Sequence, residues 1–86
     1  MVTLRVIYTP DERENSFPKC KKIEGKDPFD ALLNFAKLYD VEVNENIIED
    51  QAFLDLIDLL TDDGRVNLSF VQNAETGETY HDIAFQ

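Results

Sequence analysis

Carboxylate side chains are concentrated between residues 40 and 63. Within this stretch Asp55, Asp58 and Asp62 are three and four residues apart, the spacing of side chains on one face of an α-helix. Gln51, four residues before Asp55, extends the same row. At a rise of about 1.5 Å per residue, consecutive carboxylates lie about 4.5–6 Å apart, which is comparable with the spacing of about 3.4 Å between phosphates along a nucleic-acid strand. The stretch contains no lysine or arginine, and its acidic residues are Asp40, Glu42, Glu45, Glu49, Asp50, Asp55, Asp58, Asp62 and Asp63.

Such a row carries local energetic costs. Aspartate is a weak helix former, carboxylates on one helix face repel each other, and the C-terminal end of a helix dipole favours cations. The sequence places Asp55, Asp58 and Asp62 toward that end of the expected helix, and no neighbour in sequence neutralises the stretch. Because residues that break local rules are often kept for function, these costs indicate a surface for a cationic partner.

The partner we expect is a protein with a basic, nucleic-acid-binding groove. Arginine side chains bind carboxylates with two hydrogen bonds, much as they bind phosphates, and opposite charges speed the encounter. In size and acidity the chain resembles the small phage-borne proteins that block restriction or CRISPR nucleases. We therefore predict a non-enzymatic inhibitor of such a protein or nuclease, with binding residues Glu49, Asp50, Asp55, Asp58, Asp62 and Asp63.

Two other interpretations stay open. In the first, the acidic residues only keep the protein soluble, and the chain is an adaptor or assembly module that binds through its sheet. The contact would be an open edge near residues 17–23 or an uncovered face, which would also permit a homodimer. Residues expected on that face are Ile7, Val71, Tyr80 and Ala84.

In the second, the chain is a small enzyme. Cys20 lies among lysines that would favour its thiolate, and His81 is the single histidine. This interpretation is the weakest, because the two residues are distant in sequence and no catalytic motif accompanies them. We expect no cofactor and no metal, since residues 58–64 lack the ligand spacing of a calcium loop.

The elements that must position these residues follow from hydropathy patterns. Apolar and polar residues alternate over residues 2–8, which predicts a strand, and a second strand is expected over residues 17–23. Asp27 and Pro28 predict the start of a helix that ends near Asp40. Asn46, with Glu49 three residues later, predicts the start of a second helix, which ends before residue 64.

The C-terminal part predicts a β-hairpin. Residues 66–71 alternate in hydropathy, Gly77 lies where the loop needs a positive φ, and residues 79–85 form the last strand. The resulting order, β-β-α-α-β-β, predicts a single α+β domain over residues 1–86. Its antiparallel sheet has both helices packed on one face.

Composition limits the class of partner. Of 86 residues, 43% are hydrophobic and 30% are charged, as in a globular domain, and the net charge is −10. Residues 1–26 carry six basic and four acidic side chains (+2), whereas residues 27–86 carry two and fourteen (−12). This excess repels nucleic acids and anionic membranes, so we expect neither to bind directly. A single cysteine, with no signal or spanning segment, predicts a cytoplasmic protein.

Overall fold

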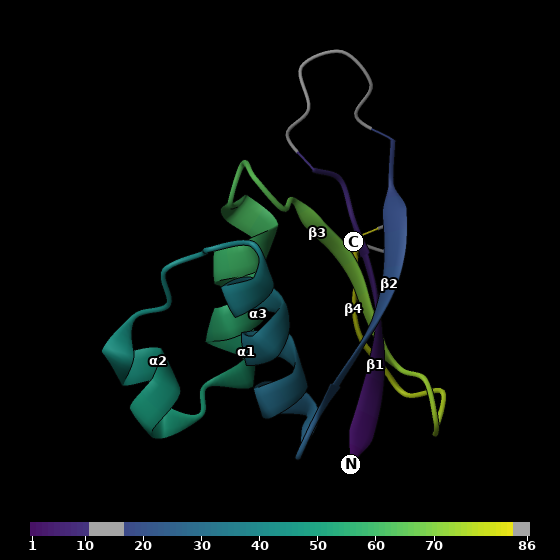
Figure 1. Cartoon of the computed structure of the whole chain (residues 1–86), viewed down its shortest axis with the longest axis horizontal. Coiled ribbons are helices and arrows are strands. Elements are labelled where there is room, and N and C mark those ends of the chain that lie inside the picture. The colour runs from purple at the N-terminus through teal and green to yellow at the C-terminus, as the bar shows by residue number, and fades with distance from the viewer. Residues whose placement is uncertain (11–16, 84–86) are drawn as a thin grey trace.

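A computed structural model describes residues 1–10 and 17–83. Within these residues, strands and helices follow one another in the order β-β-α-α-α-β-β (Figure 1). The predicted α+β class and antiparallel sheet are confirmed, with one helix more than expected. The strands are β1 (Val2–Tyr8), β2 (Lys19–Gly25), β3 (Leu68–Asn73) and β4 (Thr79–Asp82), and the helices are α1 (Pro28–Leu38), α2 (Glu45–Asp50) and α3 (Phe53–Asp62).

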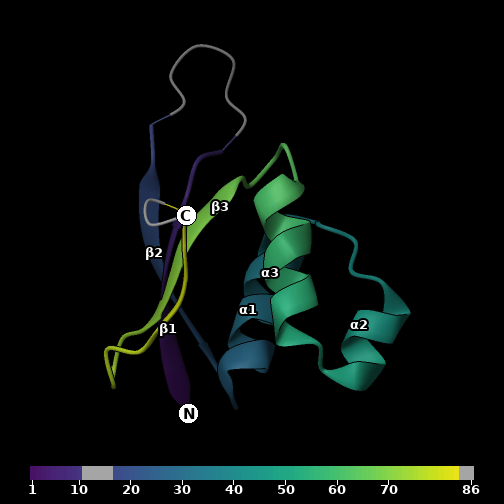
Figure 2. The ribbon, with the colours of Figure 1, turned by 180° about the vertical axis from the view of Figure 1, so that it is seen from behind.

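The strands form one antiparallel sheet in the order β2-β1-β3-β4. β1 therefore lies inside the sheet, and its Val6 pairs with Lys21 of β2 on one side and with Val71 of β3 on the other. All three helices lie on one side of the sheet, where α1 packs on β1 and β2, and α3 packs on β3 (Figures 1 and 2). We call the opposite side of the sheet, which none of these helices covers, the open face.

The core lies between the sheet and the two longer helices. In β1, Leu4, Val6 and Tyr8 are buried beneath the helices, so the residues between them, Arg5 and Ile7, point to the open face. The helices supply apolar side chains at the predicted helical spacing. Those with no exposed surface are Ala31, Leu32, Phe35 and Ala36 of α1 and Leu56 and Leu60 of α3.

α1 begins where the sequence predicts. Oδ1 of Asp27 accepts a hydrogen bond from the N–H of Asp30 at 2.8 Å, and Pro28 is the first helical residue. The first turn packs tightly on the end of β2, because a Cβ atom at Gly25 would lie only 2.3 Å from the backbone nitrogen of Ala31. The helix ends at Leu38, close to the predicted end near Asp40.

The prediction of one helix through to residue 63 is wrong. The chain forms α2 and α3 instead, which are separated at Gln51, a residue with the left-handed φ of 48°. The N–H groups of Gln51 and Ala52 donate to the carbonyls of Ile48 (3.3 Å) and Ile47 (3.0 Å). This pair of hydrogen bonds is the Schellman motif, which ends a helix.

Several element boundaries differ from prediction by a few residues. The residue that caps α2 is Asn44 rather than Asn46: its side-chain oxygen accepts from the N–H of Asn46 at 2.9 Å. β2 spans Lys19–Gly25 instead of residues 17–23. β4 ends at Asp82 instead of residue 85, and residues 84–86 lie outside the described residues.

β3 differs from prediction in the side chains that it buries. Tyr8 pairs with Leu68, but Ile7 pairs with Phe70, so Ser69 is an extra residue in β3 at this point. The bulge turns Val71 into the core, where it is fully buried, and leaves Phe70 opposite Ile7 on the open face. The prediction that Val71 lies on an uncovered face is therefore wrong.

A second irregularity reorients β4. The register shifts so that Val71 pairs with His81 and Gln72 with Thr79. Tyr80 consequently points toward the helices, and its ring packs edge to face on Phe53 of α3 with ring centroids 5.1 Å apart. The prediction that Tyr80 lies on the uncovered face is wrong as well, and Ala84 lies outside the described residues.

Candidate protein-binding face

The three α3 carboxylates that the sequence predicts on one face all reach the surface. Asp55, Asp58 and Asp62 are exposed, whereas Leu56 and Leu60 on the other side of the helix have no exposed surface. Within the described part of the chain, no hydrogen bond or ion pair engages these three carboxylates. We call Asp55, Asp58 and Asp62 the acidic row.

The acidic row runs from one end of α3 to the other. Asp55 lies in the first turn, where the helix dipole favours a carboxylate, so its predicted place toward the negative end is wrong. The reason is that the helix begins at Phe53. Asp62 is the last helical residue, and the last turn contains no basic residue. The dipole therefore disfavours Asp62 but not Asp55.

The other predicted carboxylates of this stretch lie partly elsewhere. Glu49 and Asp50 are exposed on α2, which stands away from the sheet on the far side of α3 and α1 (Figures 1 and 2). Gln51 does not extend the row, because its left-handed conformation ends α2. The predicted binding residues are thus divided between two short helices.

Two exposed apolar residues of the same helices were not predicted from the sequence. Leu54 is 69% exposed beside Asp55, and Ile48 on α2 is 41% exposed. Leu54 also lies one turn before Asp58 on α3, so it borders the acidic row. The available signal was its position outside the Phe53, Leu56, Leu60 stripe that faces the core. An exposed apolar side chain bordered by polar residues matches the apolar centre and polar rim of a protein interface.

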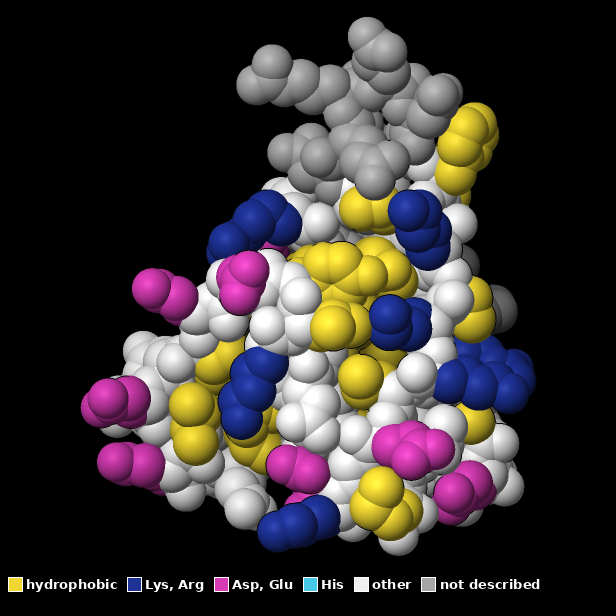
Figure 3. Space-filling model, in the orientation of Figure 1, with side chains coloured by type: hydrophobic (Ala, Val, Ile, Leu, Met, Phe, Trp, Pro, Cys, Tyr) yellow, Lys and Arg dark blue, Asp and Glu magenta, His cyan; other side chains and the backbone are white. Residues whose placement is uncertain are grey.

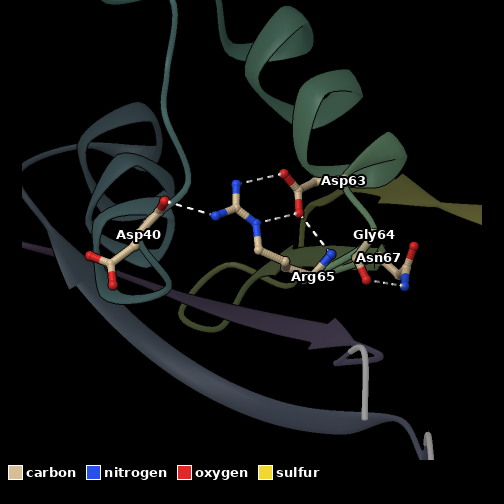
Figure 4. Close-up of polar contacts among 5 residues, drawn as sticks. All are labelled: Asp40, Asp63, Gly64, Arg65 and Asn67. Carbon is tan, nitrogen blue, oxygen red and sulfur yellow. Dashed lines mark hydrogen bonds and ion pairs between the residues drawn. The ribbon is translucent and has the colours of Figure 1, made fainter. Parts of the chain in front are cut away.

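Asp63 is already neutralised by a residue of this chain (Figure 4). Its Oδ1 accepts from the backbone N–H of Arg65 at 2.8 Å, and its Oδ2 lies 3.2 Å from Nη2 of Arg65. Nη1 of Arg65 donates to the backbone carbonyl of Asp40 at 3.2 Å. The hydrogen bonds from Arg65 lower the pKa of Asp63. The expectation that no neighbour in sequence neutralises the acidic stretch is therefore wrong at its C-terminal end.

The two candidate catalytic residues are not brought together. Cys20 is exposed on β2, and His81 is on β4, with β1 and β3 between these strands. Nε2 of His81 lies 3.2 Å from Oγ1 of Thr61, whose hydroxyl also donates to the carbonyl of Ile57 at 2.7 Å. His81 therefore joins β4 to α3.

A second side chain with a shifted pKa, Tyr39, lies between α1 and β1. The hydroxyl groups of Tyr8 and Tyr39 are hydrogen-bonded, and both rings contact Phe35, at centroid distances of 5.1 Å. Burial and then the bond to Tyr8 raise the pKa of Tyr39, against the opposing effect of Lys21 and Lys19. Among residues 1–10 and 17–83 we find no pocket, and no cluster of acidic, cysteine or histidine residues that could hold a metal ion.

Basic side chains are concentrated on and around β2, although both signs of charge occur on either side of the molecule (Figure 3). In Figure 3 basic side chains gather over β2, and acidic side chains project from the side of α2. The described basic residues on β1, β2 and the turn that follows are Arg5, Lys19, Lys21, Lys22 and Lys26.

Comparison with known proteins adds no assignment. No protein-family model, curated protein or solved structure matches the chain. No helix of the described residues is long and apolar enough to cross a membrane.

Proposed function

We propose that this chain is a non-enzymatic binding protein that presents the acidic row to a basic, nucleic-acid-binding surface of another protein, and thereby blocks it. The observation that carries the proposal is that Asp55, Asp58 and Asp62 are exposed together on one helix without a cationic partner in the described chain. Such a surface matches the field of an arginine-rich groove.

The surroundings of the row support the same kind of partner. Exposed Leu54 supplies apolar contact area next to the carboxylates. A partner would therefore gain apolar burial in addition to electrostatic attraction. Glu49 and Asp50 extend the negative surface onto α2. Because Asp63 is already bound to Arg65, we assign it to the structure of the helix end rather than to the binding face.

The test uses the immobilised protein in a bacterial lysate. Captured proteins are washed with rising salt and, separately, with duplex DNA. We expect release of a nucleic-acid-binding protein by both, because salt screens the contact and DNA competes for the same groove. The variant Asp58→Asn/Asp62→Asn should bind the released protein about two- to thirtyfold more weakly, since two exposed pairs are worth about 0.2–1 kcal/mol each.

A matched variant controls for net charge. Glu75→Gln/Glu78→Gln removes the same two charges from the exposed β3–β4 loop, away from α3, and should bind like the parent. Equal weakening by both double variants would show that only overall charge matters. A partner that withstands both salt and DNA would contradict the proposal and favour an adaptor that binds through its sheet.

A further inference from the structure

The outer edge of β2 carries backbone groups that the fold does not use. On β1, the carbonyl of Thr3 accepts from the N–H of Ala74 at 2.9 Å, and the carbonyl of Ile7 accepts from the Ser69 hydroxyl at 3.1 Å. Both carbonyls therefore point to the β3 side. In an antiparallel ladder, the residues opposite them on β2 must then point their backbone groups away from β1.

Those residues are Glu24, opposite Thr3, and Cys20, opposite Ile7. Lys22 lies between them, two residues from each, so its backbone groups point away from β1 as well. The side chain of Asn34 confirms the direction, because its Nδ2 donates to the carbonyl of Glu24 at 3.0 Å. That bond satisfies one outward carbonyl. The outward N–H and C=O groups of Cys20 and Lys22 have no partner within the described residues.

The side chains around these groups are basic. Lys22 lies directly opposite Arg5 on the open face, an arrangement in which like charges repel. Neither of them, nor Lys21, forms an ion pair within residues 1–10 and 17–83. Glu24, two residues along β2, is the acidic side chain on the same face of the strand. A carboxylate placed beside Lys22 by another chain would relieve the repulsion.

An apolar side chain lies along the same edge. Asn34, which reaches the carbonyl of Glu24, is one helical turn before Leu38 on the same face of α1. Leu38 is 54% exposed, and Ile23 of β2 is half-buried. In Figure 3 basic side chains over β2 lie beside apolar surface.

We propose that the β2 edge binds an extended acidic segment of another protein, which pairs with Cys20 and Lys22 as an additional strand of the sheet. A second copy of this chain does not fit well. Antiparallel pairing of β2 with β2 centred on Cys20, Lys21 or Lys22 would place lysine against lysine. A register that sets Lys22 against Glu24 of the other copy would need the carbonyl of Glu24, to which Asn34 already donates. Nucleic acid is disfavoured by the net charge of −10. This site is separate from α3, so it goes beyond the function proposed above.

The probe is a blocked peptide of alternating glutamate and valine, titrated into the isotope-labelled protein and followed by NMR of backbone amides. We expect the largest shifts at Cys20 and Lys22, together with slower hydrogen exchange of these two amides. The reverse-charge peptide, alternating lysine and valine, should not bind. Lys22→Glu should weaken binding about three- to tenfold, by removing one attraction and adding one repulsion.

Cys20→Pro tests the strand pairing without changing charge. It removes an N–H that points away from β1, so the sheet keeps its own hydrogen bonds, and peptide binding should be lost. Cys20→Ser is the matched control and should bind like the parent.

Three results would overturn the proposal: equal binding of both peptides, undiminished binding by a folded Cys20→Pro variant, or the same amide shifts with a single-stranded oligonucleotide in place of the peptide. Should Cys20→Pro fail to fold, undiminished binding by Lys22→Glu would have the same consequence. Asp58→Asn/Asp62→Asn should leave peptide binding unchanged, which separates this site from the acidic row.

Discussion

Three residues other than glycine adopt left-handed backbone conformations in the described chain: Asp40, Gln51 and Asn67. Two of them, Asn67 and Asp40, form hydrogen bonds with residues distant in sequence. Nδ2 of Asn67 donates to the carbonyls of Gly64 (3.1 Å) and Thr9 (3.3 Å), and the carbonyl of Asp40 accepts from Arg65. The side chain of Gln51 makes no such contact among the described residues and is exposed. The left-handed conformation of Gln51 is supported by the backbone hydrogen bonds that end α2, but no side-chain contact with the described residues offsets the steric cost of its Cβ atom.

We predict that Gln51→Gly raises the free energy of unfolding by about 0.5–1 kcal/mol, because glycine adopts a positive φ without steric cost and only part of the gain is lost to unfolded-state entropy. Chemical denaturation of the parent and the variant would measure the change. Gln51→Ala is the control and should stay within a few tenths of a kcal/mol, since alanine keeps the Cβ atom. A loss of stability in Gln51→Gly would mean that the side chain has a contact that outweighs its strain.

At the scale of the element, α3 has carboxylates at both of its ends. Asp55 lies in the first turn and Asp62 is the last residue, and both are exposed. The two side chains thus have the same chemistry and similar exposure, but the helix dipole acts on them with opposite sign.

Asp62→Lys should therefore stabilise the protein, whereas Asp55→Lys should not, although both change the net charge by the same amount. We expect their free energies of unfolding to differ by about 1.2–4 kcal/mol, because each substitution replaces a charge worth about 0.3–1 kcal/mol in the dipole field by one of opposite sign. Thermal unfolding at low salt measures this difference, and added salt should reduce it. Equal stabilisation by both substitutions would show that net charge, and not the helix dipole, determines the effect.

The sequence predicts elements well where a local signal marks their ends. Asp27 and Pro28 locate the start of α1 because a cap and a fixed φ act within one turn. The break at Gln51 has no such signal, since glutamine is a good helix former and the Schellman motif shows only in the backbone.

Tertiary contacts explain the remaining differences. The bulge at Ser69 depends on pairing with β1, so alternation alone placed Val71 on the wrong face. For the candidate site, the spacing of Asp55, Asp58 and Asp62 was sufficient to predict a shared exposed face. It could not predict that Arg65, just beyond the acidic stretch, folds back on Asp63.

At the scale of the whole molecule, charge of one sign dominates a small volume. The net charge is −10, and the described residues extend over 35 × 29 × 24 Å. At an ionic strength of about 0.01 M the screening length is about 30 Å, so most acidic residues repel one another across the molecule. At about 0.1 M it is about 10 Å, and the repulsion is largely local.

We therefore predict that the melting temperature rises when sodium chloride is raised from about 0.01 to 0.1 M. A gain of about 1 kcal/mol would correspond to about 4–8 °C for a domain of this size. Calorimetry at both salt concentrations measures it, and Glu75→Gln/Glu78→Gln should show a smaller rise. A melting temperature that falls with salt would show that attractive pairs, such as Asp63 with Arg65, outweigh the repulsion.

The position of β1 inside the sheet also bears on how the protein forms during synthesis. β1 can pair with β2 and contact α1 as soon as residues 1–38 have left the ribosome. Its other edge stays unpaired until β3, 60 or more residues further along the chain, has been made. Until then the apolar side chains of Leu4 and Val6 are only partly covered, and one row of β1 hydrogen-bonding groups is open. In the nascent chain, β1 is thus an edge strand for a time, although it is an inner strand of the finished sheet. Exposed edge strands are where aggregation begins.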